Sequence, residues 1–155
     1  MPAIEEIVRE IGAMEGVATV VGEGVGEGAW FFFYDPRRDQ DPTKRQPFAT
    51  VVTRDDFDAG ASALEARGAF RVNLGVKPET YRARFGPLPA WNRSGGAVET
   101  GHDHAREDVL LPHPVYAPMG WVCVVNPSDA TWRALRPLLE EAYETQRRHV
   151  TAGRT

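Results

Sequence analysis

Histidines are the residues of this sequence most able to carry chemistry, and three of its four, His102, His104 and His113, lie near one another along the chain. His102 and His104 would point to the same side of an extended segment, because alternate residues of a strand share a face. With Glu107 and Asp108 close by, these nitrogen and oxygen donors suit zinc or another divalent cation. The spacing matches no established metal motif, so we prefer the alternative of an exposed acidic loop.

His113 is held between Pro112 and Pro114, which favour extended backbone geometry and so fix where the imidazole points. One interpretation makes the ring a ligand-binding or acid–base group, because imidazole titrates near neutral pH. The other makes the ring structural: it bonds a backbone carbonyl and braces the start of the strand led by Trp121. We favour the structural interpretation and keep the functional one open.

Side chains that combine an apolar body with a polar group could line a binding pocket. Tyr116 and Trp121 are of this kind, and core packing is the alternative for both. Arg71 and Asn73 alternate with apolar residues in 70–74, so they point away from the apolar side of that strand. Solvation, or contact with a loop, is the alternative for these two. The predicted ligand-binding residues are Arg71, Asn73, His113, Tyr116 and Trp121.

Other residue types give little support for catalysis. Cys123 is the only cysteine and alternates with valines, so we interpret it as a small buried hydrophobe. No serine lies in a nucleophile-elbow context. Gly24, Gly26 and Ala29 fit the G-x-G-x-x-A dinucleotide fingerprint, but an aromatic strand follows where that motif needs a helix. We predict a hairpin turn there, and no cofactor other than the divalent metal considered above.

Length and composition bound the class of protein. The 155 residues fit one domain, which we place at 1–150 with a flexible tail at 151–155. A net charge of −4 argues against nucleic acid as a partner, since such binding depends on cations that neutralise phosphates. No apolar run is long enough to span a bilayer, and the first residues do not resemble a secretory signal. With a single cysteine, these features predict a cytoplasmic protein.

Hydrophobic periodicity predicts the order of the elements. The predicted strands are 17–21, 29–34, 48–53, 70–74 and 121–125. The predicted helices are 4–14, 61–66, 78–85 and a last one from Ser128 to about His149. Pro137 lies inside that last helix, where it produces either a kink or two abutting helices. Residues 86–106 show no periodicity and form a long loop.

This order predicts an α+β fold, in which an antiparallel sheet of about five strands carries the N- and C-terminal helices on one face. The second face needs a cover, because residues 30–33 are all aromatic and make both sides of their strand apolar. A ligand in a cleft between the sheet and the 86–106 loop would cover it. A second copy of the chain, in a homodimer, would cover it equally well.

Parts of the sequence resemble known families. The segments from Phe70 to Glu79, His113 to Val125 and Trp132 to Tyr143 resemble the corresponding strand, tryptophan-led strand and terminal helix of MmcQ/YjbR-like proteins. The resemblance covers about half the chain and implies an α+β fold with an antiparallel sheet.

The full-length pattern is more similar to an uncharacterised bacterial domain-of-unknown-function family. It includes Gln46-Pro-Phe-Ala-Thr50, Phe70-Arg-Val-Asn73 and the box His113-Pro-Val-Tyr116. Neither resemblance supplies a catalytic site.

Three functions follow, in order of preference. The first is a non-catalytic binding module for a small ligand or a protein partner, using the cleft described above. The second is a metal-dependent enzyme built on His102, His104 and His113. The third is nucleic-acid binding through the basic residues of the 37–45 loop, which rests on analogy with YjbR-like proteins alone.

Overall fold

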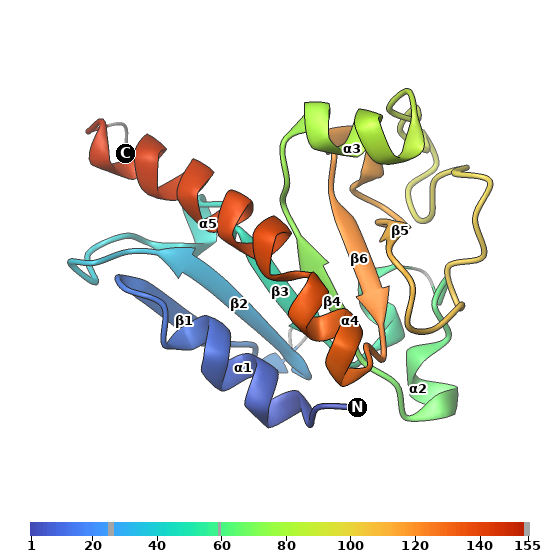
Figure 1. The fold of residues 1–155 in the computed structure, drawn as a ribbon, viewed down its shortest axis with the longest axis horizontal. Coiled ribbons are helices and arrows are strands. Elements are labelled where there is room, and N and C mark those ends of the chain that lie inside the picture. Colours follow the sequence, from blue (N-terminus) through green and yellow to red (C-terminus); the bar gives the residue numbers. More distant parts are fainter. Residues whose placement is uncertain (25–26, 59, 154–155) are drawn as a thin grey trace.

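The computed structural model describes residues 1–24, 27–58 and 60–153, and in them six strands form one antiparallel sheet of order β1-β2-β3-β4-β6-β5 (Figure 1). The strands are β1 (Val17–Val21), β2 (Ala29–Tyr34), β3 (Ala49–Val52), β4 (Arg71–Leu74), β5 (Leu111–Pro112) and β6 (Val122–Val125). The helices are α1 (Ile4–Gly12), α2 (Leu64–Arg67), α3 (Pro78–Phe85), α4 (Asp129–Ala134) and α5 (Arg136–Thr151). Short 3-10 turns are η2 (Pro42–Lys44), η3 (Asp55–Phe57) and η4 (Ala117–Met119). The predicted α+β class is confirmed.

Five of the strands lie where periodicity predicted them, and β5 is additional. It consists of Leu111 and Pro112, which pair with Cys123 and Val122 at one edge of the sheet. A strand of two residues is too short for an alternating pattern, so hydrophobicity could not reveal it. β1 and β2 pair as the predicted hairpin. The middle of the predicted turn, residues 25–26, lies outside the described residues.

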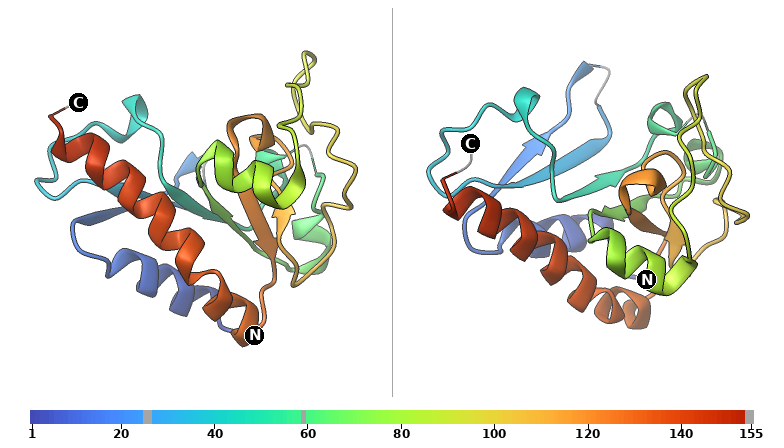
Figure 2. Two further views of the ribbon diagram at one scale, coloured as in Figure 1. Left: turned by 45° about the horizontal axis from the view of Figure 1, so that its top comes forward. Right: turned by 90° about the horizontal axis from the view of Figure 1, so that it is seen from above.

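The helices α1, α3, α4 and α5 cover one face of the sheet, as seen from above in the right view of Figure 2. Ile7 and Ile11 of α1 and Leu139 of α5 have no exposed surface and pack with Phe32 and Val72 of the sheet in one cluster. Each fully buried aliphatic or aromatic side chain of this kind contributes about 1.5–3 kcal/mol to the free energy of unfolding. This cluster is the main core.

The C-terminal helical region is divided in two, as one of the two alternatives for Pro137 predicted. Ser128 caps α4, because its hydroxyl accepts a hydrogen bond from the Thr131 N–H at 3.2 Å. α4 ends at Ala134, and Pro137 lies in the first turn of α5, where a missing N–H costs nothing. α5 reaches Thr151, the first residue of the predicted tail, and residues 154–155 lie outside the described residues.

The second face of the sheet is covered in part by the chain itself. Leu64 of α2 packs with Val52, Val125 and Phe31 in a smaller cluster. The guanidinium of Arg45 lies over the ring of Phe33, 5.6 Å from its centre. The chain thus covers part of the aromatic strand on this face, and a homodimer stays a prediction. Within the described residues, no helix is both long and apolar enough to cross a membrane.

Candidate ligand-binding site

A cavity of about 470 Å³ opens on the second face of the sheet, and we call it the sheet pocket. Its floor contains Thr50 and Asn73, which are direct partners in the register of β3 and β4. Its walls come from the segment before β3 and from the turn between β5 and β6. The lining residues are Phe31, Arg45, Gln46, Pro47, Thr50, Val52, Asp56, Arg71, Asn73, His113, Tyr116, Met119 and Trp121.

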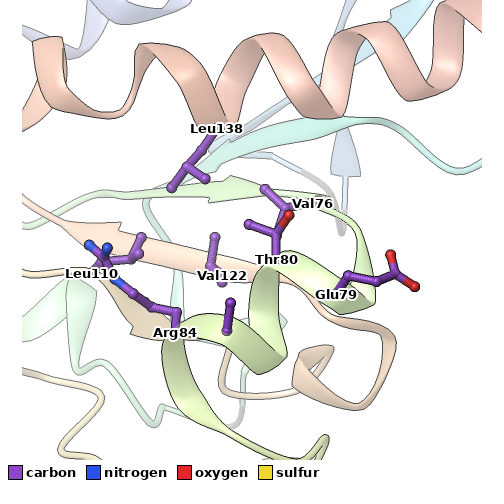
Figure 3. Close-up of a pocket in the computed structure, with 8 residues that line it drawn as sticks. Val76, Glu79, Thr80, Arg84, Leu110, Val122 and Leu138 are labelled. Carbon is purple, nitrogen blue, oxygen red and sulfur yellow. The ribbon is translucent and has the colours of Figure 1, made fainter.

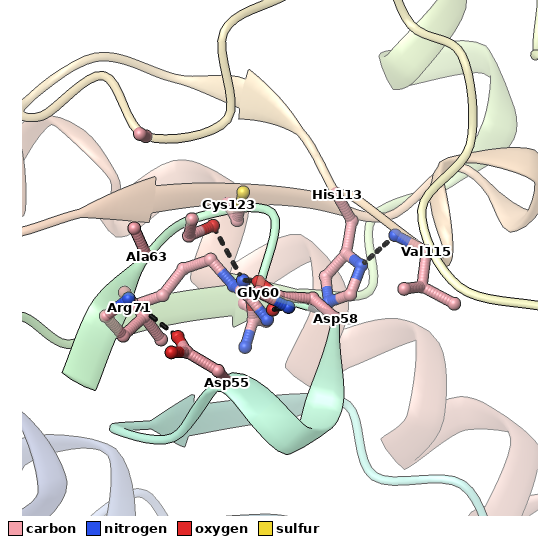
Figure 4. Close-up of polar contacts among 12 residues, drawn as sticks. Asp55, Asp58, Gly60, Ala63, Arg71, His113, Val115 and Cys123 are labelled. Carbon is pink, nitrogen blue, oxygen red and sulfur yellow. Dashed lines mark hydrogen bonds and ion pairs between the residues drawn. The ribbon is translucent and has the colours of Figure 1, made fainter. Parts of the chain in front are cut away.

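Arg71 provides the charge at the floor of the sheet pocket. Strand alternation directs Val72 and Leu74 into the main core and sends Arg71 and Asn73 to the second face. The Arg71 side chain is fully buried, and its Nη1 pairs with the carboxylate of Asp58, which is also fully buried (Figure 4). Burial of both charges is tolerated because each neutralises the other.

The remaining nitrogens of the Arg71 guanidinium differ in their contacts. Nη1 also donates to the Ser62 hydroxyl at 2.8 Å, and Nε donates to Asn73 Oδ1 at 2.7 Å. Asn73 in turn donates through Nδ2 to the Thr50 hydroxyl at 2.9 Å. Nη2 is buried and has no hydrogen-bond partner in the described part of the chain. An unpaired buried donor of this kind costs about 1–3 kcal/mol.

His113 is buried, and its ring orientation is set by the backbone beside it. Nδ1 accepts hydrogen bonds from the backbone N–H groups of Val115 and Tyr116, both at 3.0 Å. Because Nδ1 accepts, the neutral ring must carry its proton on Nε2. Burial, reinforced by the positive charge of Arg71, lowers the pKa of His113 well below 6.5. Figure 4 shows the ring between Val115 and the Asp58 side chain.

Aromatic side chains form one wall of the sheet pocket. The rings of His113, Tyr116 and Trp121 lie within 5.1–6.3 Å of one another, centre to centre. Trp121 is buried, whereas Tyr116 is 44% exposed and contacts the ring of Trp91. Met119, at the end of η4, is 38% exposed on the same side. The pocket thus combines a polar floor with an apolar wall that reaches the surface.

Comparison with protein families matches residues 2–155 to a family of unknown function, DUF6194. The chain belongs to the DUF6194 family. Searches of curated proteins and of solved structures each gave no match. The resemblance to a domain-of-unknown-function family is thereby confirmed, and the similarity to MmcQ/YjbR-like proteins stays a prediction.

All of the predicted ligand-binding residues of this DUF6194 chain line the sheet pocket: Arg71, Asn73, His113, Tyr116 and Trp121. The cleft itself differs from the prediction, because no residue of 86–106 lines this pocket. That loop is attached beside it: Val98 N–H donates to the Pro114 carbonyl at 2.7 Å, and Trp91 contacts Tyr116. Residues 45–47 form the wall that the loop was expected to form.

The predicted metal ligands of the DUF6194 chain lie in different surroundings. His102 is exposed and stacks edge-on against Phe85, with ring centres 5.3 Å apart. His104 bonds the Thr100 hydroxyl at 2.8 Å through Nε2, and burial lowers its pKa. His113 has its Nδ1 occupied by backbone N–H groups. Among the described residues, no group of three histidine, cysteine or carboxylate side chains is arranged to hold a metal ion.

Arg45 and Asp58 are the important site residues that periodicity did not single out. Arg45 belongs to the basic loop that was considered for nucleic acid, but its Nη2 donates to the Tyr34 carbonyl at 2.9 Å. Asp58 follows η3, and only the fold brings it to Arg71. A buried arginine in a predicted strand was the one available signal, since such a charge requires an acidic partner.

A second cavity, of about 400 Å³, lies on the helix-covered face between α3, α5 and β6 (Figure 3). Val76, Val122 and Leu138 give it an apolar lining. Thr80, its central polar group, already donates to Glu141 at 2.7 Å. None of the described side-chain atoms that are both buried and unpartnered belongs to this cavity. It therefore lacks the unsatisfied polar group that distinguishes the sheet pocket.

Proposed function

We propose that this DUF6194 protein is a non-catalytic module that binds a small molecule in the sheet pocket. The observation that carries the proposal is the buried, unpartnered Nη2 of Arg71 at the floor of an accessible cavity. A ligand oxygen placed there would restore the missing hydrogen bond and recover the free energy lost by desolvating this donor. Folding leaves Nη2 of Arg71 without a hydrogen bond, and a bound ligand would supply it.

The size and composition of the pocket support the same function. A volume of about 470 Å³ lies in the range of small-molecule sites, which are mostly apolar and carry a few fixed polar groups. Here the polar groups are held by bonds to one another: Asp58, Ser62 and Asn73 fix the guanidinium, and the backbone fixes His113. Such preorganisation reduces the entropy lost on binding.

Binding without catalysis is favoured by the chemistry of the lining residues. The proton acceptor of His113 is already occupied by two N–H groups, so the ring offers a donor and cannot serve as a general base. Burial raises the pKa of the nearby Cys123 thiol to about 12, which removes the thiolate needed for nucleophilic attack. These groups therefore suit recognition of a ligand and not its conversion.

A fragment screen by NMR tests this function. Isotope-labelled protein is titrated with a set of drug-like fragments, and binding is followed at the Trp121 indole N–H and the Arg71 Nε–H. The variant Gln46→Trp places a large ring at the exposed rim of the pocket, and Glu5→Trp places the same ring on exposed surface of α1. We expect some fragments to shift both reporter signals. Glu5→Trp should leave these shifts unchanged, and Gln46→Trp should abolish them. Fragments that bind only elsewhere would overturn the proposal.

A further inference from the structure

The charges around the sheet pocket do not cancel, and this bears on the kind of ligand that the proposed binding function would use. Arg71 is paired with Asp58, and Asp56 is paired with Arg54 at 3.1 Å. Arg45 lines the pocket but forms no ion pair with any described residue. The pocket therefore carries one uncompensated positive charge. Desolvating such a charge is unfavourable unless a counter-charge is supplied.

The buried side-chain atoms of the sheet pocket that lack a hydrogen-bond partner among the described residues are donors. Arg45 holds the Tyr34 carbonyl and the Gln146 side chain through Nη2, but its Nη1 is buried with no partner. Arg71 Nη2 is likewise buried without a hydrogen-bond partner. His113 presents Nε2–H, because its other nitrogen accepts from the backbone. A ligand that satisfies these groups must bring oxygen acceptors and negative charge.

The positions of the two arginines give the ligand a length. Arg45 lies over Phe33 of β2, and Arg71 extends along β4 to Asn73. Between them, Phe31, Thr50 and Asn73 form one rung across β2, β3 and β4. Two inter-strand spacings amount to about 10 Å, and the two residues from Phe31 to Phe33 add about 7 Å along β2, so the diagonal between the two arginines is roughly 12 Å. A molecule with one ring and an oxygen at either end spans this distance when its two terminal hydrogen bonds, of about 2.9 Å each, are included, and its flat body would lie against the aromatic wall at Trp121.

From these observations, we infer that the ligand is a small carboxylic acid with a flat ring and a second oxygen. Its carboxylate binds Arg45, and the second oxygen accepts from Arg71 Nη2 and His113 Nε2–H. One carboxylate balances the one uncompensated charge, whereas a phosphate monoester, with nearly two negative charges, would exceed it. The inference rests on the proposed function and adds the class of ligand.

The test compares two matched probes, para-hydroxybenzoate and para-hydroxybenzamide, with phenyl phosphate, which supplies the other anion but no second oxygen. Each is titrated into the labelled full-length protein, and affinity is read from the shifts of the Trp121 indole and Arg71 Nε–H signals. We expect the acid to bind roughly tenfold more tightly than the amide, as for one charge-assisted hydrogen bond of about 1.4 kcal/mol. Phenyl phosphate should bind more weakly than the acid.

Variants then assign the charge to Arg45. Arg45→Gln should bring the acid to the affinity of the amide and leave the amide unchanged, whereas Arg45→Lys, which keeps the charge, should retain a preference for the acid. Arg133→Gln, at an exposed arginine outside the pocket, is the matched control and should change nothing. The affinities of the acid and the amide for the unmodified protein can be compared whether or not any variant folds.

The outcomes separate this inference from the proposed function. If acid and amide bind in the pocket with equal affinity, the carboxylate inference is wrong and the binding function stands. If phenyl phosphate binds most tightly, the anion is a phosphate and the carboxylate inference is again wrong. If none of these probes and no fragment of the broader screen shifts the two reporter signals, the proposed binding function is wrong as well.

Discussion

Arg71 and Asp58 form an ion pair in which neither side chain has any exposed surface. The pair lies under the sheet pocket and joins β4 to the segment that follows η3. It orients the guanidinium so that Nη1 is occupied while Nη2 stays unpartnered. This ion pair thus joins two segments of the fold and fixes the orientation of the guanidinium that lines the pocket.

Removing the acidic partner should be costly. Asp58→Asn leaves the Arg71 charge buried without a counter-charge, so we expect the free energy of unfolding to fall by about 3–5 kcal/mol. Urea unfolding followed by circular dichroism measures the loss. The control is Glu140→Gln, which breaks an exposed pair with Arg136 and should cost less than about 1 kcal/mol. Equal losses in the two variants would show that the buried pair is not critical.

The protonation of His113 can be observed directly. Two backbone N–H groups point at Nδ1, so we expect a neutral ring with the proton on Nε2. Long-range nitrogen–proton NMR spectra distinguish the two tautomers. Because burial holds the pKa of His113 well below 6.5, the ring should remain neutral as the pH falls past that value. A proton on Nδ1, or titration at the ordinary pKa of histidine, would contradict this geometry.

The same pKa shift gives stability a pH dependence. As the pH falls below about 6.5, the unfolded chain takes up a proton on this histidine before the folded protein does, so the free energy of unfolding decreases. We expect His113→Asn, which keeps an acceptor near the backbone, to reduce this slope on the acid side. His104, whose pKa burial also lowers, contributes a further part of it. Urea unfolding at a series of pH values measures the slope, and an unchanged slope would argue against a buried neutral ring.

The close approach of Gly75 to Trp121 offers a way to alter the pocket wall. A Cβ at Gly75 would lie 2.8 Å from Trp121 Cζ2, so in Gly75→Ala either the indole or the backbone has to shift. We expect a loss of about 1–3 kcal/mol in stability and a shift of the Trp121 indole N–H signal.

Gly12→Ala is the matched control for this change. Its Cβ would lie 2.8 Å from Thr19 Oγ1, where α1 packs on β1 across the sheet from the pocket, and so crowds another region to a similar degree. It should leave the Trp121 signal in place. An unmoved Trp121 signal in Gly75→Ala would mean that the backbone yields and the indole does not.

Cys123 should be inert in the folded protein. Its side chain is buried and burial raises the pKa of the thiol to about 12, so almost no thiolate is present at neutral pH. We expect a disulfide reagent such as dithionitrobenzoate to label it slowly in buffer and rapidly in urea. Rapid labelling of the folded protein would show that the strand pair β5–β6 opens readily.

Much of the fold follows from local patterns that act within a few residues. Ile7 and Ile11 share one face of a helix, Ser128 caps another, and Pro137 divides the C-terminal helices. Strand alternation was enough to separate Arg71 and Asn73 from the core side of β4. These two residues line one pocket together with the other predicted ligand-binding residues. Here periodicity decides which side of an element faces the core.

The site itself depends on contacts between distant segments, which periodicity does not record. Asp58 reaches Arg71 and Arg45 reaches Phe33 only after the sheet has formed. Local pattern likewise could not predict that residues 45–47 would replace the 86–106 loop as the pocket wall. The sequence by itself determined the elements and their buried faces, because these follow from the spacing of apolar residues. Only the tertiary structure decided which charges are paired and which donors stay free, because pairing depends on distances between residues far apart in the chain.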